Sequence, residues 1–90
     1  MYHKLIAEFL GTAFFSFVIF ASGFNWLMIG SALALVILCI GKISGAAINP
    51  AISFAFYHSG KISQTELFGY IIVEMLGALA GYELFKRYVH

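Results

Sequence analysis

Hydrophobic residues occupy three long runs along the chain, separated by short segments that carry glycine, asparagine and charged residues. The runs extend over about residues 5–24, 26–41 and 66–86. A helix of about 20 residues is about 30 Å long, which matches the hydrocarbon core of a bilayer. We therefore predict three transmembrane helices. The first is expected to be retained rather than cleaved as a signal peptide, because Glu8 interrupts its apolar region early.

A shorter segment, residues 44–58, lies between the second and third runs. Residues 44–48 read as an extended stretch. Asn49 suits an N-cap and Pro50 the first helical position, so a helix is predicted to begin there and to end before Gly60. About nine residues make only about 13 Å of helix, less than half of the bilayer. The pattern therefore indicates a re-entrant half-helix that begins within the membrane.

Composition agrees with a membrane protein. The 90 residues are 62% hydrophobic and 10% charged, with a mean hydropathy of +0.96. A soluble helical protein needs a polar face on each helix, and these runs leave none. The net charge of +1 gives no reason to expect a nucleic-acid partner. The expected fold class is all-α, integral and multi-pass, in a plasma or inner membrane.

Positive charges are distributed almost evenly between the two membrane faces. Three spans place the chain ends on opposite faces. One face then carries Lys4, Lys42 and Lys61, and the other carries Lys86 and Arg87. The positive-inside preference is weak, so we expect the chain to insert in both orientations.

Three groups of residues carry a family resemblance. Residues 7–12 read Ala-Glu-Phe-Leu-Gly-Thr, residues 44–53 read Ser-Gly-Ala-Ala-Ile-Asn-Pro-Ala-Ile-Ser, and the third run carries Tyr70, Glu74, Gly77, Ala78 and Gly81. In this order they resemble the first helix, first re-entrant loop and third helix of aquaporin-type channels, the major intrinsic protein family. The resemblance implies that residues 1–90 are a single half-channel repeat, whereas family members carry two inverted halves in one chain.

The chain departs from the family pattern at several positions. Ala47 stands where the loop commonly carries histidine, and Glu74 stands where glutamine is usual. Ile52 follows the Asn-Pro-Ala motif, where the second half of the family carries an arginine that narrows the pore. Ile29 aligns with a constriction residue of the family, although a lipid-facing isoleucine is an equal alternative. We therefore expect a wider or more apolar pore than that of a strict water channel.

The half-helix itself indicates a pore. Its N-terminus carries unsatisfied N–H groups and a partial positive charge, which are costly to bury in lipid. An inverted counterpart would bring two Asn49 side chains together around an aqueous path, where their amides donate to passing oxygens and nearby carbonyls accept. The candidate pore residues are Gly45, Ala46, Ala47, Ile48, Asn49, Pro50, Ala51, Ile52 and Ile29.

The expected partner is an antiparallel copy of the chain or a complementary half-channel chain, surrounded by lipid. The resemblance further implies that four such pores assemble together. Conduction of water or small neutral solutes such as glycerol is the leading hypothesis. The alternatives are a dual-topology proton-coupled transporter and a non-conducting truncated or assembly subunit. No nucleophile–base pair or metal-ligand set is present in the sequence, so no enzyme, metal or cofactor is expected.

Four further residues are candidates for supporting roles. Glu8 and Glu74 lie in apolar runs, where carboxylates are costly. They either accept hydrogen bonds from the re-entrant backbone or couple transport to protons. The resemblance favours the first reading for Glu8, and both readings stay open for Glu74. Gly77 and Gly81 form a small-residue motif that predicts close helix packing.

Overall fold

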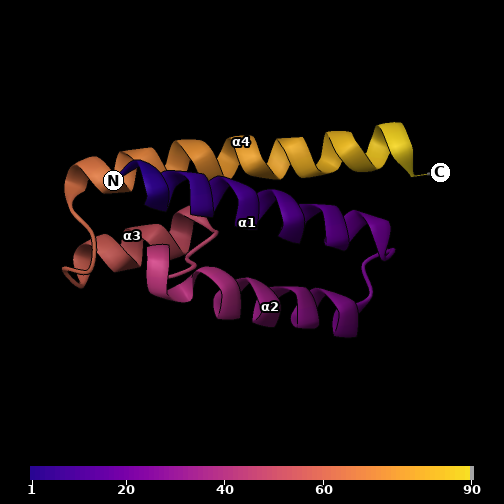
Figure 1. Cartoon of the computed structure of the whole chain (residues 1–90), viewed down its shortest axis with the longest axis horizontal. Coiled ribbons are helices and arrows are strands. Elements are labelled where there is room, and N and C mark those ends of the chain that lie inside the picture. The colour runs from indigo at the N-terminus through magenta and orange to yellow at the C-terminus, as the bar shows by residue number, and fades with distance from the viewer. Residues whose placement is uncertain (90) are drawn as a thin grey trace.

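The computed structural model describes residues 1–89, and these residues form four helices and no strand (Figure 1). The helices are α1 (Tyr2–Ala21), α2 (Trp26–Ser44), α3 (Pro50–His58) and α4 (Gln64–Tyr88). The all-α prediction, with three long helices and one short one, is confirmed.

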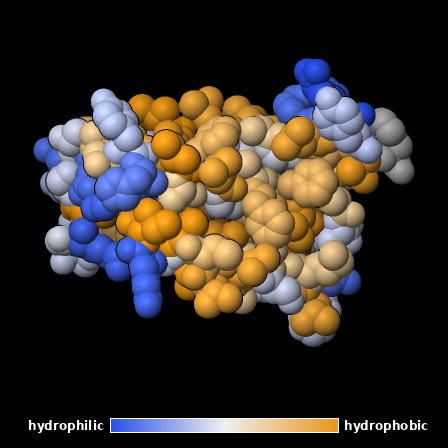
Figure 2. All heavy atoms as spheres, viewed as in Figure 1, coloured by the Kyte–Doolittle hydropathy of each residue, from blue (hydrophilic) through white to orange (hydrophobic). Residues whose placement is uncertain are grey.

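Helices α1, α2 and α4 are long and apolar enough to cross a membrane. The longest dimension of the molecule is 41 Å, close to the thickness of a bilayer with its headgroup regions. Figure 2 shows a broad hydrophobic surface with hydrophilic residues gathered towards its ends. The exposed apolar side chains come from all three long helices. The chain is therefore an integral, multi-pass membrane protein.

The short helix α3 has nine residues, and the chain turns back on itself just before it. Figure 1 shows residues 45–49 running from the end of α2 back towards the middle, from which α3 returns to the same end. Helix α4 then crosses the full length, so that α1 begins and α4 ends at opposite ends of the molecule. Helix α1 packs on both α4 and α2, while α3 packs on α4.

Two glycines allow α1 and α4 to approach each other closely. A Cβ atom added to Gly77 would lie 2.6 Å from the carbonyl oxygen of Phe9. A Cβ atom on Gly81 would be closer still to the carbonyl oxygen of Ala13. Because the obstructing atoms are backbone, no side-chain adjustment relieves the clash. Glycine is therefore required at both positions for the observed helix contact.

Several helix ends differ from the apolar runs. Helix α1 ends at Ala21, because Gly23 and the residue after it form a turn with positive φ. Helix α2 continues past Gly41 until Gly45, whose left-handed backbone caps it with an N–H bond to the Gly41 carbonyl at 3.0 Å. Helix α4 starts directly after its N-cap Ser63. The ends of the helices are thus set by the capping residues and not by the limits of the apolar runs.

Candidate functional site

The tip of α3 is formed by Asn49 and Pro50. Asn49 Oδ1 accepts a hydrogen bond from the Ala51 N–H at 2.9 Å, and Pro50 occupies a position where no N–H is needed. Asn49 is exposed, and this capping bond uses only its oxygen. Its amide nitrogen therefore stays available as a donor beside the partial positive charge of a helix N-terminus.

The backbone of the connecting segment, residues 45–49, follows a constrained path. Gly45, Ala46 and Ile48 have φ values of 88°, 54° and 41°, so the prediction of an extended stretch is wrong. Left-handed backbone is unfavourable for alanine and more so for a β-branched isoleucine. Such conformations persist where surrounding contacts determine them. The contacts that hold this segment come from α1, α2 and α4.

Glu8 of α1 binds the segment through both carboxylate oxygens. Oε1 accepts from the Ile48 N–H at 2.8 Å, and Oε2 accepts from the Ser44 hydroxyl at 2.6 Å. The same hydroxyl oxygen accepts from the Ala46 N–H at 3.2 Å. Glu8 is 0% exposed, so these bonds form away from water. Because an unpaired buried donor costs about 1–3 kcal/mol, this network fixes the strained backbone.

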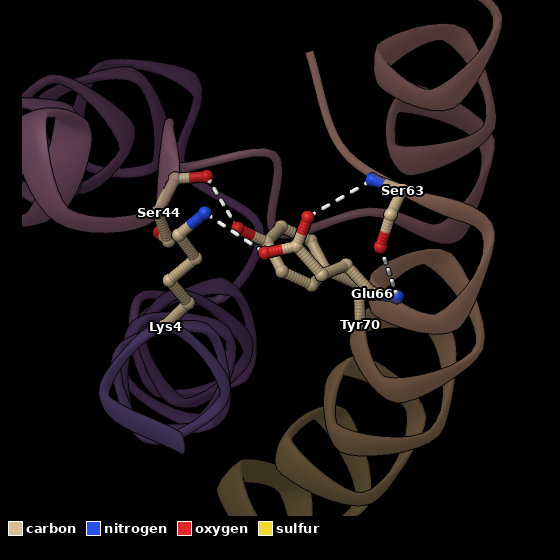
Figure 3. A network of polar contacts seen from close by, with 5 residues as sticks. All are labelled: Lys4, Ser44, Ser63, Glu66 and Tyr70. Carbon is tan, nitrogen blue, oxygen red and sulfur yellow. Dashed lines mark hydrogen bonds and ion pairs between the residues drawn. The ribbon is translucent and has the colours of Figure 1, made fainter. Parts of the chain in front are cut away.

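Tyr70 and Glu66 connect the same end of the molecule to α4 (Figure 3). The buried Tyr70 hydroxyl donates to the Ser44 carbonyl oxygen at 2.8 Å. Glu66 accepts from the Lys4 ammonium at 2.8 Å and from the Ser63 N–H at 2.9 Å, as Figure 3 also shows. The Lys4–Glu66 bond joins the first turns of α1 and α4, and the Tyr70–Ser44 bond joins α4 to the end of α2.

Glu74 of α4 contacts the half-helix one turn after its tip. Its Oε2 atom accepts from the Ser53 hydroxyl at 2.7 Å, and the residue is 1% exposed. The Ser53 N–H in turn donates to the Asn49 carbonyl at 2.9 Å. Glu8 binds the residue before Asn49 and Glu74 binds α3 one turn after it. The two carboxylates thus bind residues that precede and follow Asn49 in the sequence.

Ala46, Ala47 and Ile48 are buried. Ala47 packs with Ile62 and Leu67, while Ala46 and Ile48 pack in a separate cluster around α2. No backbone N–H of residues 1–89 donates to the carbonyl oxygens of residues 45–48. These oxygens therefore have no backbone donor among the residues that the structure describes.

Gly45 is required by its surroundings as well as by its backbone. A Cβ atom there would lie 2.7 Å from Cε2 of Phe56 and 2.8 Å from Cε of Lys61. The Lys61 ammonium lies 5.1 Å from the centre of the Phe56 ring, within cation–π range. Glycine is therefore the residue that fits both the positive φ and the available space.

The remaining candidates lie at two different places. Ala51 and Ile52 are exposed next to Asn49, with Ile52 at 45%. Ile29 is half-buried in the first turn of α2, about 22 Å of helix away from the end of α2 that leads to the tip. The structure thus groups Ile52 with Asn49 but does not bring Ile29 into the tip's hydrogen-bonded network.

Two contributors were not assigned roles from the sequence. Ser53 was read only as part of the loop motif, and Tyr70 only as part of the third-helix pattern. Ser53 is a hydroxyl one helical turn after Asn49 in an otherwise apolar half-helix, and Tyr70 lies one turn before Glu74. The signal for Tyr70 is a polar residue at helical spacing from a carboxylate in an apolar run, and the signal for Ser53 is a lone hydroxyl at helical spacing from Asn49.

Comparison with known proteins gives consistent matches. The family model described as "Major intrinsic protein" matches residues 1–90. The chain is 36% identical to lens fiber major intrinsic protein of Rattus norvegicus, 34% to that of Homo sapiens and 35% to that of Lithobates pipiens. Each match covers 89% of this chain and 35% of the relative. The chain thus spans about a third of the length of these relatives.

Proposed function

Because this chain belongs to the major intrinsic protein family, we propose that it forms half of a membrane channel for water or small neutral solutes such as glycerol. The observation that carries the proposal is α3, whose exposed tip begins towards the middle of the molecule (Figure 1). Irregular backbone at membrane depth is tolerated only where protein encloses it or a wet cavity solvates it. Asn49 therefore marks the narrow part of the path.

The chemistry of the tip suits a neutral hydroxyl-bearing molecule. The Asn49 amide supplies donors, and the free carbonyl oxygens of residues 45–48 supply acceptors in series. A molecule that both donates and accepts hydrogen bonds can replace its bonds to water with bonds to these groups. The positive N-terminal end of α3 opposes cations, including protons, at the same point. Ile52 contributes an apolar wall, which favours small solutes with some carbon surface.

An inverted counterpart is needed to complete such a path. A second α3 entering from the opposite membrane face would place a second Asn49 against the first, and a parallel neighbour would not. The near balance of positive charges between the two ends favours insertion in both orientations. The proposed partner is an antiparallel second copy related by a two-fold axis in the membrane plane. A complementary half-channel segment would serve the same purpose.

Osmotic swelling of proteoliposomes tests the conduction. Vesicles that contain the chain should swell faster than empty vesicles after an osmotic step. Ile52→Trp places a large ring beside Asn49 and should abolish most of the increase. Leu38→Trp is the matched control, because Leu38 lies on α2 with 82% exposure and away from the tip. Wild-type rates equal to those of empty vesicles, with insertion demonstrated, would refute conduction.

Asn49→Ser separates the capping role from the pore role. Serine retains an N-cap acceptor for the Ala51 N–H but lacks the amide donors. We expect the folded protein to persist, with circular dichroism unchanged, while solute flux falls. If flux is unchanged in a correctly inserted Asn49→Ser protein, the Asn49 amide does not line the path.

Disulfide trapping distinguishes antiparallel from parallel pairs. Trp26 and Lys61 are exposed at opposite ends of the molecule, so cysteines at these positions report orientation once Cys39 is replaced. An antiparallel pair brings position 26 of one copy to the same membrane face as position 61 of the other. We expect mixed 26–61 crosslinks between copies. Exclusive 26–26 and 61–61 crosslinks would contradict the inverted arrangement.

A further inference from the structure

Two buried carboxyl groups from different helices meet behind the half-helix tip. Glu8 comes from α1 and is 0% exposed, and Glu74 comes from α4 and is 1% exposed. The two carboxyl groups lie within hydrogen-bonding reach of each other. The close approach of α1 and α4 at Gly77, one turn after Glu74, brings them together. Conduction through the path described above does not require this contact.

The hydrogen-bond partners of the two groups are unequal. Both oxygens of Glu8 accept bonds, from the Ile48 N–H and from the Ser44 hydroxyl. Glu74 accepts at Oε2 from the Ser53 hydroxyl, whereas Oε1 has no partner among residues 1–89. A fully ionised carboxylate oxygen without a donor is costly in a buried site. Both oxygens of Glu8 therefore have a donor, whereas Glu74 has one at Oε2 and the Asn49 N–H nearby.

No cation compensates the pair. The ion pairs among residues 1–89 are Lys4–Glu66 and Arg87–Glu83, so neither Glu8 nor Glu74 has a salt-bridge partner. The other titratable or charged groups on the four helices are Tyr2, His3 and Lys4 on α1, Cys39 and Lys42 on α2, Tyr57 and His58 on α3, and Glu66, Tyr70, Tyr82, Glu83, Lys86, Arg87 and Tyr88 on α4. Lys42, Tyr57 and His58 are exposed, and the Tyr70 hydroxyl donates a hydrogen bond to the Ser44 carbonyl oxygen.

We propose that Glu8 and Glu74 form a proton-binding site, in which one proton resides on Oε1 of Glu74 and is donated to the Glu8 carboxylate. Two contacting carboxyl groups in a buried site cannot both be ionised, and a shared proton removes one charge. It also gives Oε1 the partner that it lacks. The pair then carries one net negative charge, which sits on Glu8 and is satisfied by the re-entrant segment.

The proton links the chain's stability to pH. The folded state holds a proton that the unfolded chain releases at neutral pH, so stability falls as pH rises. Loss of the proton places a second negative charge beside Ser53 and Ile48, whose bonds hold the two sides of Asn49. The half-helix tip is the element that loosens first at alkaline pH.

Infrared spectroscopy of the purified full chain in lipid bilayers tests the site directly. A protonated carboxylic acid has a carbonyl stretching band that an ionised carboxylate lacks. We expect one such band per chain at neutral pH in the wild-type protein and in Glu83→Gln, whose glutamate is exposed on α4. Glu74→Gln should lose the band. Its absence from the wild type, or its persistence in Glu74→Gln, would overturn the assignment.

Thermal unfolding provides a second readout that does not depend on transport. Glutamine has nearly the shape of a protonated glutamic acid, and its amide donates to Glu8 as the acid would. We expect Glu74→Gln to match the wild-type melting temperature at neutral pH and to keep it as pH rises, whereas the wild type melts progressively lower. A parallel decline of both proteins would refute the link between this proton and stability.

Discussion

Replacing Glu8 with leucine removes both acceptors that hold the segment before Asn49. The Ser44 hydroxyl can still donate to the Ile40 carbonyl oxygen at 3.5 Å, which partly offsets the loss of its bond to Glu8. The Ile48 N–H has no such alternative among residues 1–89, and it is left unpaired in a buried site. An unpaired buried donor costs about 1–3 kcal/mol. A loss of about 2 kcal/mol corresponds to about thirtyfold more frequent opening of the segment.

Local opening is a better measure of this change than overall stability. A buried leucine also avoids the desolvation cost of a buried charge, so the global melting temperature mixes two opposing effects. Hydrogen exchange of the Ile48 amide, followed by NMR, isolates the lost bond. We expect the exchange of this amide in Glu8→Leu to accelerate about thirtyfold, while amides in the middle of α2 change little.

Glu83→Leu is the matched control for this experiment. Glu83 is a glutamate on a long helix, but its side chain is 48% exposed and pairs loosely with Arg87 at 3.6 Å. Exposed pairs of this kind contribute little, so the Ile48 amide should be unaffected. If Glu8→Leu also leaves Ile48 exchange within twofold of the wild type, Glu8 does not hold the re-entrant segment.

Further substitutions test the packing around the site, each read by the melting temperature in detergent. Gly81→Val forces a side chain against the Ala13 carbonyl, so we expect a loss of about 3 kcal/mol or failure to fold; a stable variant would contradict the close contact. Tyr70→Phe removes the buried bond to Ser44 and should cost about 1–2 kcal/mol, and no change would mean that the bond contributes nothing. Lys4→Gln breaks a partly exposed ion pair and should cost less than about 1 kcal/mol; a larger loss would show that this pair anchors α4.

Local signals in the sequence identify the fold's main elements. Asn49 and Pro50 are a cap and a first helical residue by type, and the structure uses them in that way. The lengths of the apolar runs separate three spans from one half-helix, because membrane thickness sets a minimum length. These features depend on residues within a few positions of one another, and so they are readable without a structure.

The conformation of residues 45–48 depends on distant residues and could not be read locally. Ala46 and Ile48 adopt positive φ because Glu8, far away in sequence, accepts the bonds that this path presents. Gly41 was expected to end the second helix, but the cost of one glycine within a helix is only about 1 kcal/mol. The contacts of α2 with α1 and the cap at Gly45 outweigh it.

The proximity of Glu8 and Glu74 also could not be predicted from the sequence. Each carboxylate was recognised as costly in its own apolar run, yet nothing in either run indicates that the two meet. Their approach follows from the glycine-mediated packing of α1 on α4. The distribution of hydrogen-bond donors, which leaves one oxygen of Glu74 unpartnered, is visible only once α3 is in place.

Water access to the α3 tip in a bilayer tests the account most directly. In a Cys39→Ser background, a cysteine replaces either Ile52 at the tip or Leu38 on the outer surface of α2, and each is treated with a membrane-impermeant thiol reagent. Leu38 is the more exposed of the two in the isolated chain, at 82% against 45%. A lined aqueous path predicts modification at position 52 and protection by lipid at position 38. Protection at position 52 equal to that at position 38 would mean that the tip faces lipid, and no channel would form there.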